Sequence, residues 1–263
     1  MQEILDHYEQ VREDLRLTQG WGLLELARTQ ELILARLAKP PGTVLDIGGA
    51  AGIYSAWLGS LGYETHLIDP VPSHVERARA IRAIKTAVAG DARNLDWRDD
   101  SVDSVLMLGP LYHLTERSDR LMALREARRV LRRGGVLFAA AISRFASLLD
   151  SLVRGFIDDP RFVPIVERDL KDGQHRNPTG DPNYFTTAFF HRSEELKEEV
   201  HEAGFSIIEL AGIEGPAWLA RDFEGRWADP IRRDQLLALC RVVEREPALL
   251  GLSPHLLITA RKA

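Results

Sequence analysis

The chain has 263 residues, of which 45% are hydrophobic and 28% are charged, a composition typical of a globular enzyme with one sizeable core. The 34 Lys and Arg residues against 39 Asp and Glu residues give a net charge of −5, which offers no electrostatic support for nucleic acid or an anionic membrane as a partner. A single cysteine, Cys240, excludes an intrachain disulfide and a thiolate metal cluster, and no stretch approaches the roughly 20 apolar residues of a membrane helix, so we expect a cytoplasmic protein.

Apolar runs that alternate with helical patterns predict an α/β fold. The runs TVLDI, THLID, KTAVAGD, SVDSVLML and GVLFAAAIS predict five strands, and residues 53–62 and 118–135 between them carry helix signals. After residue 193 the chain reads as a helix, the strand FSIIEL, a helical insertion and a last apolar run, HLLITA. We therefore expect a three-layer αβα sandwich around a mostly parallel seven-stranded sheet with an antiparallel C-terminal strand.

The order of these elements divides the chain into four parts. Residues 1–40 read as an N-terminal helical cover and residues 41–142 as the ligand-binding core. Residues 143–192, with DDP, DGQ and NPTGDPN, are too irregular for another strand and helix, and we interpret them as a lid or substrate insertion. Residues 193–263 complete the core.

Residues 44–52, VLDIGGAAG, predict a strand followed by a tight turn of small residues. Such a turn lets backbone N–H groups approach a dinucleotide, a phosphate or another nucleoside-bearing cofactor. Counting from Gly48, a dinucleotide fingerprint would need glycines where Ala50 and Ile53 stand, and GGAAGIYS lacks the lysine of a Walker loop. The turn therefore favours a nucleoside-bearing cofactor of another kind.

Two further motifs follow the next strands: Asp69 ends the second strand, and Gly90-Asp91 follows the third. Together with D-x-G-G-A-A-G, they resemble the class I S-adenosylmethionine-dependent methyltransferases over residues 44–142. More narrowly, the stretch from LGPLYHL to AAAIS resembles bacterial small-molecule methyltransferases, including N-methyltransferases of natural-product pathways. The resemblance implies S-adenosyl-L-methionine as cofactor and S-adenosyl-L-homocysteine as product.

The resemblance also implies a role for each motif. A carboxylate at the end of the second strand can accept two hydrogen bonds from ribose hydroxyls, and Asp91 with the backbone of Ala92 would read adenine. Ala50 stands where the family has its central glycine, and its methyl group fits there if φ is negative. The expected cofactor-binding residues are Asp46, Gly48, Gly49, Ala50, Gly52, Asp69, Pro70, Asp91, Ala92 and Leu108, with Tyr8 and Arg28 from N-terminal helices over the cleft.

Methyl transfer is an in-line displacement, so the protein mainly has to align the acceptor and exclude water. An ammonium or hydroxyl acceptor also has to lose a proton, and histidine is the usual base near neutral pH. His113, after the fourth strand, is the first candidate to orient or deprotonate the acceptor, and His191 in the insertion is the second.

We do not assign the other histidines to the site. We expect His175 to be exposed in a loop rich in Gly, Pro and Asp, and His74 and His255 to be surface or framework residues. Tyr112, Tyr184 and Phe189 are the expected substrate-binding aromatics, suited to a planar or cationic acceptor.

The acceptor itself stays open between alternatives. A small-molecule nitrogen or oxygen in secondary metabolism is the first hypothesis, a quinone or sterol-like carbon acceptor the second, and a non-catalytic cofactor-binding module the third. LGPLYHL lacks the Asp and Asn ligands of metal-dependent catechol enzymes and departs from the [DNS]PP[YFW] signature of DNA amino-methyltransferases, so we expect neither metal nor nucleic acid. The sequence does not decide between a monomer and a homodimer.

Overall fold

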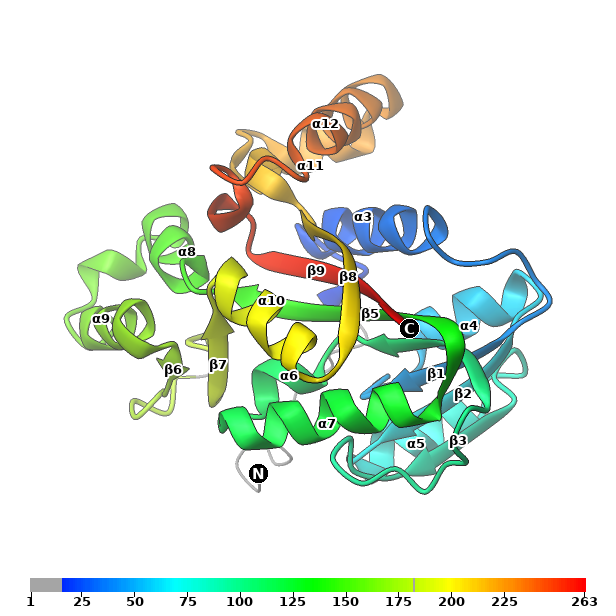
Figure 1. Cartoon of the computed structure of the whole chain (residues 1–263). Coiled ribbons are helices and arrows are strands. Elements are labelled where there is room, and N and C mark those ends of the chain that lie inside the picture. The colour runs from blue at the N-terminus through cyan, green and yellow to red at the C-terminus, as the bar shows by residue number, and fades with distance from the viewer. Residues whose placement is uncertain (1–15, 182) are drawn as a thin grey trace.

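A computed structural model describes residues 16–181 and 183–263, and its centre is a mixed β-sheet (Figure 1). Its main strands run in the order β3-β2-β1-β4-β5, followed by β9 and then β8, and β9 is antiparallel to both β5 and β8. This topology confirms the predicted fold. The strands are β1 (Thr43–Ile47), β2 (Glu64–Asp69), β3 (Thr86–Ala89), β4 (Val102–Met107), β5 (Leu131–Ser143), β8 (Phe205–Gly212) and β9 (His255–Lys262).

Helices cover both faces of this sheet because successive strand residues point to opposite sides. Leu137 and Ala139 of β5 pack in one apolar cluster with α7 (Arg117–Val130) and α10 (Ser193–Glu202). Phe138 and Ala140 pack in a second cluster with α3 (Gly22–Leu34) and α4 (Ile53–Ser60), and α5 (Pro72–Arg79) lies beside α4. None of the helices in the described part of the chain has the length and apolar character to cross a membrane.

The insertion at residues 143–192 is more regular than its sequence indicated. It contains α8 (Ala146–Arg154), η1 (Phe156–Asp158), α9 (Val163–Asp172), β6 (Gln174–His175) and β7 (Ala188–His191). β7 pairs in parallel with the last two residues of β5, and β6 pairs antiparallel with β7, so the insertion extends the sheet (Figure 1). The expectation of an irregular lid missed β6 and β7 because both strands are too short to show a period of two.

A second helical segment separates β8 from β9. It comprises η2 (Gly215–Leu219), α11 (Phe223–Ala228), α12 (Pro230–Val243) and η3 (Leu250–Leu252), and it projects beyond the sheet in Figure 1. Cys240 of α12 is buried with Trp218 and Phe223 against Leu24 of α3. The N-terminal helix α3 is thereby fixed to the C-terminal part of the fold.

Candidate active site

Two adjoining cavities lie where ligands bind in open α/β sheets, beyond the carboxyl ends of the parallel strands. The first, of about 550 Å³, is surrounded by residues that follow β1, β2, β3 and β4. The second, of about 1050 Å³, lies between the insertion and the segment after β8. Arg16, Glu25, Tyr112 and His255 line both, so the two cavities share a wall.

The turn after β1 forms the floor of the first cavity. Gly48 has φ +70° and Gly52 has φ +89°, in the left-handed region that favours glycine. A Cβ on Gly48 would lie 2.7 Å from the Pro110 side chain, and one on Gly49 would lie 2.7 Å from the Asp46 carboxyl group. The two glycines therefore allow the backbone to pass close to α6 (Pro110–His113) and to β1.

Ala50 departs from expectation, because its φ is +47° and not negative. Its N–H donates a 2.8 Å hydrogen bond to Asp69 Oδ2, which holds the turn in this conformation. A left-handed conformation costs an L-residue with a Cβ roughly 1–2 kcal/mol relative to glycine. The chain therefore carries backbone strain at the edge of the first cavity.

Replacing Ala50 with glycine should relieve this strain. Part of the gain is offset by the greater freedom of glycine in the unfolded chain, so we expect Ala50→Gly to raise the free energy of unfolding by about 0.5–1 kcal/mol. Denaturant titration would measure the change, with Ala51→Gly, whose φ is not positive, as the matched control that should be destabilised. Equal decreases in the free energy of unfolding of the two variants would contradict the backbone strain at Ala50.

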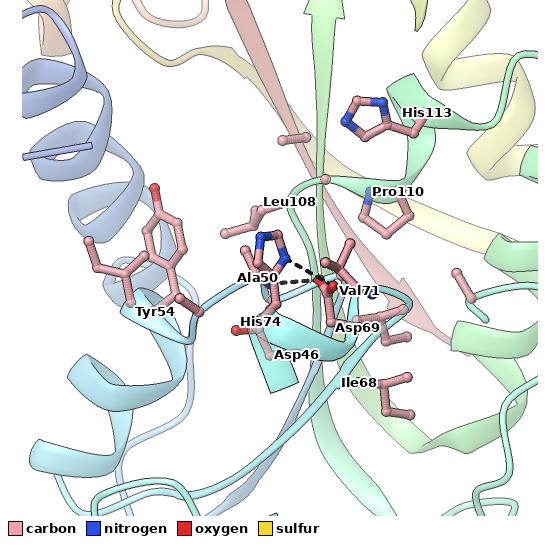
Figure 2. Close-up of a pocket in the computed structure, with 18 of the residues that line it drawn as sticks. Asp46, Ala50, Tyr54, Ile68, Asp69, Val71, His74, Leu108, Pro110 and His113 are labelled. Atoms are coloured by element: carbon pink, nitrogen blue, oxygen red, sulfur yellow. Dashed lines mark hydrogen bonds and ion pairs between the residues drawn. The ribbon is translucent and has the colours of Figure 1, made fainter. Parts of the chain in front are cut away.

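Asp69, at the end of β2, occupies the middle of the first cavity (Figure 2). Its Oδ1 accepts hydrogen bonds from the Val71 N–H at 2.9 Å and interacts with His74 Nδ1 at 3.1 Å. Among the described residues, Oδ2 accepts a hydrogen bond from the Ala50 N–H alone, and it so retains capacity for a ligand hydroxyl. His74 is 3% exposed and lines the cavity, so the expectation of a surface or framework position missed its contact with the site.

Asp46, on β1, lies beneath the turn. Ser55 Oγ donates to its Oδ2 at 2.7 Å, while Oδ1 has no hydrogen-bond partner among the described residues. Burial raises the pKa of Asp46 to about 7, and the neighbouring Asp69 carboxylate adds to the effect against the opposing Ser55 hydrogen bond. An ammonium or amide group bound above the turn could satisfy this oxygen, directly or through water.

Asp91, which follows β3, lines the other end of the first cavity beside Ala92. A hydrogen-bonded pair with Arg93 (Nη2 to Oδ2, 2.6 Å) lowers the pKa of Asp91, and Arg93 also contacts Asp119 at 2.7 Å. Because of this pair, an adenine base bound here would meet a carboxylate whose charge is already partly neutralised. Arg93 was not among the residues expected at the site.

A charged cluster stands where the two cavities meet. Arg16 Nη2 donates to Glu25 Oε1 at 2.9 Å, and His255 Nδ1 lies 2.6 Å from Glu214 Oε1. Burial lowers the pKa of His255, but Glu25 and Glu214 outweigh it and raise the value to about 9, so the imidazole is charged at neutral pH. Burial raises the pKa of Glu25, but Arg16 and His255 lower it to about 2. His255 was expected to be a surface or framework residue, yet it lines both cavities.

This cluster also has the spacing of a cation site. One ligand atom from each of Glu25, Glu214 and His255 lies within 4.8 Å of the others. However, the guanidinium of Arg16 and the imidazolium of His255 already balance the two carboxylates. The arrangement is therefore complete as an ion-pair network without a metal.

The predicted acceptor residues divide between the cavities and the interior. His113, at the end of α6, lines the first cavity, and its ring lies 4.7 Å from that of Tyr112 and 6.1 Å from that of Phe185 (Figure 2). Tyr112 lines both cavities and Tyr184 lines the second. These residues come from α6 and from the insertion, so the structure does bring the two segments together.

His191 and Phe189 lie elsewhere, and their expected positions facing a ligand are wrong. His191 is completely buried and lines neither cavity, and its Nε2 interacts with Glu199 Oε2 at 3.3 Å. Burial lowers the pKa of His191 despite the Glu199 carboxylate. The Phe189 ring is covered by the Arg120 guanidinium, whose Cζ lies 3.7 Å from the ring centroid. Both residues join β7 to α7 and α10.

Three further expectations concern the cofactor. Arg28 lines neither cavity, because it is buried between α3 and the segment after β8, where it pairs with Glu31 and Glu244. Gly52 also lines neither, but its N–H closes the turn onto the Gly49 carbonyl at 2.9 Å. Tyr8 lies outside the described residues. The remaining predicted cofactor residues, Asp46, Gly48, Gly49, Ala50, Asp69, Pro70, Asp91, Ala92 and Leu108, all line the first cavity.

Residues 45–139, which carry the turn after β1 together with Asp69 and Asp91, match the family described as methyltransferase domain. An S-adenosylmethionine-dependent methyltransferase from Mesorhizobium loti has the same fold, with a TM-score of 0.62, 17% identity, and coverage of 90% of this chain and 99% of that one.

Curated relatives resemble parts of the chain. A ubiquinone biosynthesis O-methyltransferase from Methylobacterium sp. (strain 4-46) is 26% identical over 71% of this chain and 66% of its own length. A ubiquinone/menaquinone biosynthesis C-methyltransferase from Acidiphilium cryptum (strain JF-5) is 37% identical over 44% of this chain and 48% of its own length. The chain thus spans less than two thirds of these relatives.

Proposed function

We propose that the protein transfers a methyl group from S-adenosyl-L-methionine to a small molecule. One observation carries the proposal: the turn after β1, Asp46 of β1, Asp69 at the end of β2 and Asp91 after β3 converge on one cavity of about 550 Å³. The bound cofactor supplies an electrophilic methyl group on a sulfonium. The residues of the chain bind the cofactor, orient the acceptor and exclude water.

The roles follow from the contacts. Asp69 Oδ2 accepts a ribose hydroxyl, and Asp91 with the Ala92 backbone contacts adenine. The turn at Gly48 and Gly49 accommodates the amino-acid end, whose ammonium is positioned by the unpartnered Oδ1 of Asp46. Pro70 and Leu108 complete the apolar wall.

The acceptor occupies the second cavity, which meets the first at Tyr112. Aromatic side chains dominate its apolar wall and favour a planar, hydrophobic small molecule: Trp21, Phe162, Tyr184, Phe185, Phe190, Trp218 and Phe223. His113 orients the acceptor from the first cavity. We propose nitrogen or oxygen as the acceptor atom, in bacterial secondary metabolism and in the cytoplasm.

Methylation of a quinone precursor is the second candidate. Its support is the similarity to relatives that are named as an O-methyltransferase and a C-methyltransferase of quinone biosynthesis. The size and aromatic wall of the second cavity are compatible with such a ring.

Calorimetry with S-adenosylhomocysteine and with NAD tests the cofactor first. We expect a dissociation constant on the order of micromolar for the former and no binding for the latter. Labelled S-adenosylmethionine would then be offered with phenols, amines and hydroquinones. Binding of neither compound would contradict the proposal, and binding of S-adenosylhomocysteine without transfer to any acceptor would indicate a non-catalytic module.

A further inference from the structure

A second histidine and an aspartate form a buried pair in the wall of the second cavity. His175, the last residue of β6, is 1% exposed, and its Nδ1 lies 2.8 Å from Oδ2 of Asp169, which is completely buried in α9. The Phe190 ring stacks on the imidazole at 4.8 Å with an interplanar angle of 15°. The expected exposed loop position of His175 is therefore wrong, and its ring is held in a fixed orientation.

Two polar atoms at this wall have no hydrogen-bond partner in the described part of the chain: His175 Nε2 and Ser147 Oγ. Both residues line the second cavity, Ser147 from α8 and His175 from β6. Unsatisfied buried polar atoms are uncommon in folded proteins and call for an explanation. A ligand in the cavity that hydrogen-bonds to both would provide one.

The Asp169 contact determines what His175 can do. A carboxylate can only accept, so Nδ1 carries the proton and Nε2 presents a lone pair. Asp169 would also stabilise the imidazolium that forms when Nε2 takes up a proton. Asp169 is the ion-pair partner of the ring among the described residues. The other titratable groups that line its cavity are Arg16, Glu25, Tyr112, Asp150, Arg154, Tyr184, Glu214, Asp222, Glu224 and His255.

We propose that His175, oriented by Asp169, is the general base for a hydroxyl acceptor in the second cavity and that Ser147 positions the same hydroxyl. The inference rests on the proposed function and specifies its substrate as an alcohol or phenol, because a neutral amine already carries the lone pair that attacks. The acceptor proton moves to Nε2, the oxygen forms the new bond to the methyl carbon, and the electrons of the broken carbon–sulfur bond remain on sulfur. His113 then has an orienting role only.

A neighbouring aromatic ring lies beside both histidines. Phe185 lies 6.1 Å from the rings of both His113 and His175, and its φ of +22° is unusual for a residue with a side chain. The Nε2 atom is shielded from solvent in this conformation. Phe185 lines the same cavity as His175, so its ring borders the space through which the acceptor would approach Nε2.

Nitrogen NMR of protein labelled at histidine tests the pair without any turnover. We expect His175 to be protonated at Nδ1 and unprotonated at Nε2, and Asp169→Asn to move the proton to Nε2. Catechol added in the presence of S-adenosylhomocysteine should shift the Nε2 resonance, and Ser147→Ala should weaken that response. A proton on Nε2 in the wild type, or no response to catechol, would overturn the proposal.

Turnover with catechol and labelled S-adenosylmethionine separates the base from the rest of the function. His175→Asn retains an amide that can donate to Asp169, so we expect unchanged binding of S-adenosylhomocysteine, a loss in kcat/KM of about 100-fold, and loss of one ionisation from the pH profile. The exposed His201→Asn is the control and should behave as wild type. Equal rates in wild type and His175→Asn would overturn the role of His175 as the base and leave the proposed function standing. If S-adenosylhomocysteine does not bind, the proposed function is overturned, and the NMR experiment then tests the His175–Asp169 pair by itself.

Discussion

Replacing Glu199 with alanine should lower the free energy of unfolding by about 3–5 kcal/mol, because it leaves a buried charge without its partner. Arg120 Nη2 donates to Glu199 Oε1 at 2.7 Å, and both side chains are 2% to 3% exposed. Denaturant titration would measure the loss. Glu202→Ala, which breaks the exposed pair with Arg117, is the control and should change the free energy of unfolding far less.

The Glu199 carboxylate should also make the free energy of unfolding depend on pH in the acid range. Burial raises the pKa of Glu199, but His191 and Arg120 outweigh it and lower the value to about 2. A lowered pKa means that the stabilisation is present above about pH 4.5 and is lost as the pH falls toward 2. Glu199→Ala should therefore flatten that part of the pH profile of stability. A wild-type slope that survives the substitution would assign the acid sensitivity to other carboxylates.

This ion pair matters for the site because Arg120 also holds the chain next to His113. Its Nη1 donates to the carbonyls of Leu114 and Thr115, both at 2.9 Å. Gln174, beside His175, donates to the same Thr115 carbonyl at 3.1 Å. The buried pair thus connects the two histidine-bearing segments that face the cavities. The Glu199→Ala variant should accordingly be examined for folding before any loss of activity is interpreted.

The sequence predicted the core well because its signals are local. The turn after β1, the acid at the end of β2 and Asp91 after β3 each follow a strand directly, and a parallel sheet brings their carboxyl ends together. The helices α4, α7 and α10 carry both periodicity and end signals, although α7 ends at Val130, earlier than expected, because Leu131 already pairs with Val102.

The histidines could not be placed in the same way because their partners lie in other elements. His191 and Glu199 are eight residues apart in sequence, but their side chains come into contact only because α10 packs over β7. His255 and Glu25 lie close together although most of the chain separates them in sequence. His175 lies in a stretch whose Gly and Pro content is typical of exposed loops, yet two-residue β6 pairs with β7 and buries it. Side-chain burial there is decided by tertiary packing, which a local pattern does not encode.

Replacing Asp69 with alanine should weaken S-adenosylhomocysteine binding by about 100-fold. Two hydrogen bonds from ribose hydroxyls to a carboxylate, at about 1.5 kcal/mol each, correspond to that factor. Asp69 also accepts bonds from the Ala50 and Val71 N–H groups, so a loss of affinity could arise either from the missing ribose contact or from a disordered turn. The affinity of the variant for S-adenosylhomocysteine alone does not separate these two causes.

Analogues that lack the 2′- or 3′-hydroxyl separate them by calorimetry. If Asp69 binds the ribose, wild type should bind the deoxy analogues at least about tenfold more weakly than it binds S-adenosylhomocysteine. Asp69→Ala should bind the analogues and S-adenosylhomocysteine with equal affinity. Asp96→Ala, which removes an exposed carboxylate away from the cavities, is the control and should match wild type with every ligand. If deleting a hydroxyl costs wild type and Asp69→Ala the same, Asp69 acts through the turn, where its bond to the strained Ala50 holds the backbone that faces the cofactor.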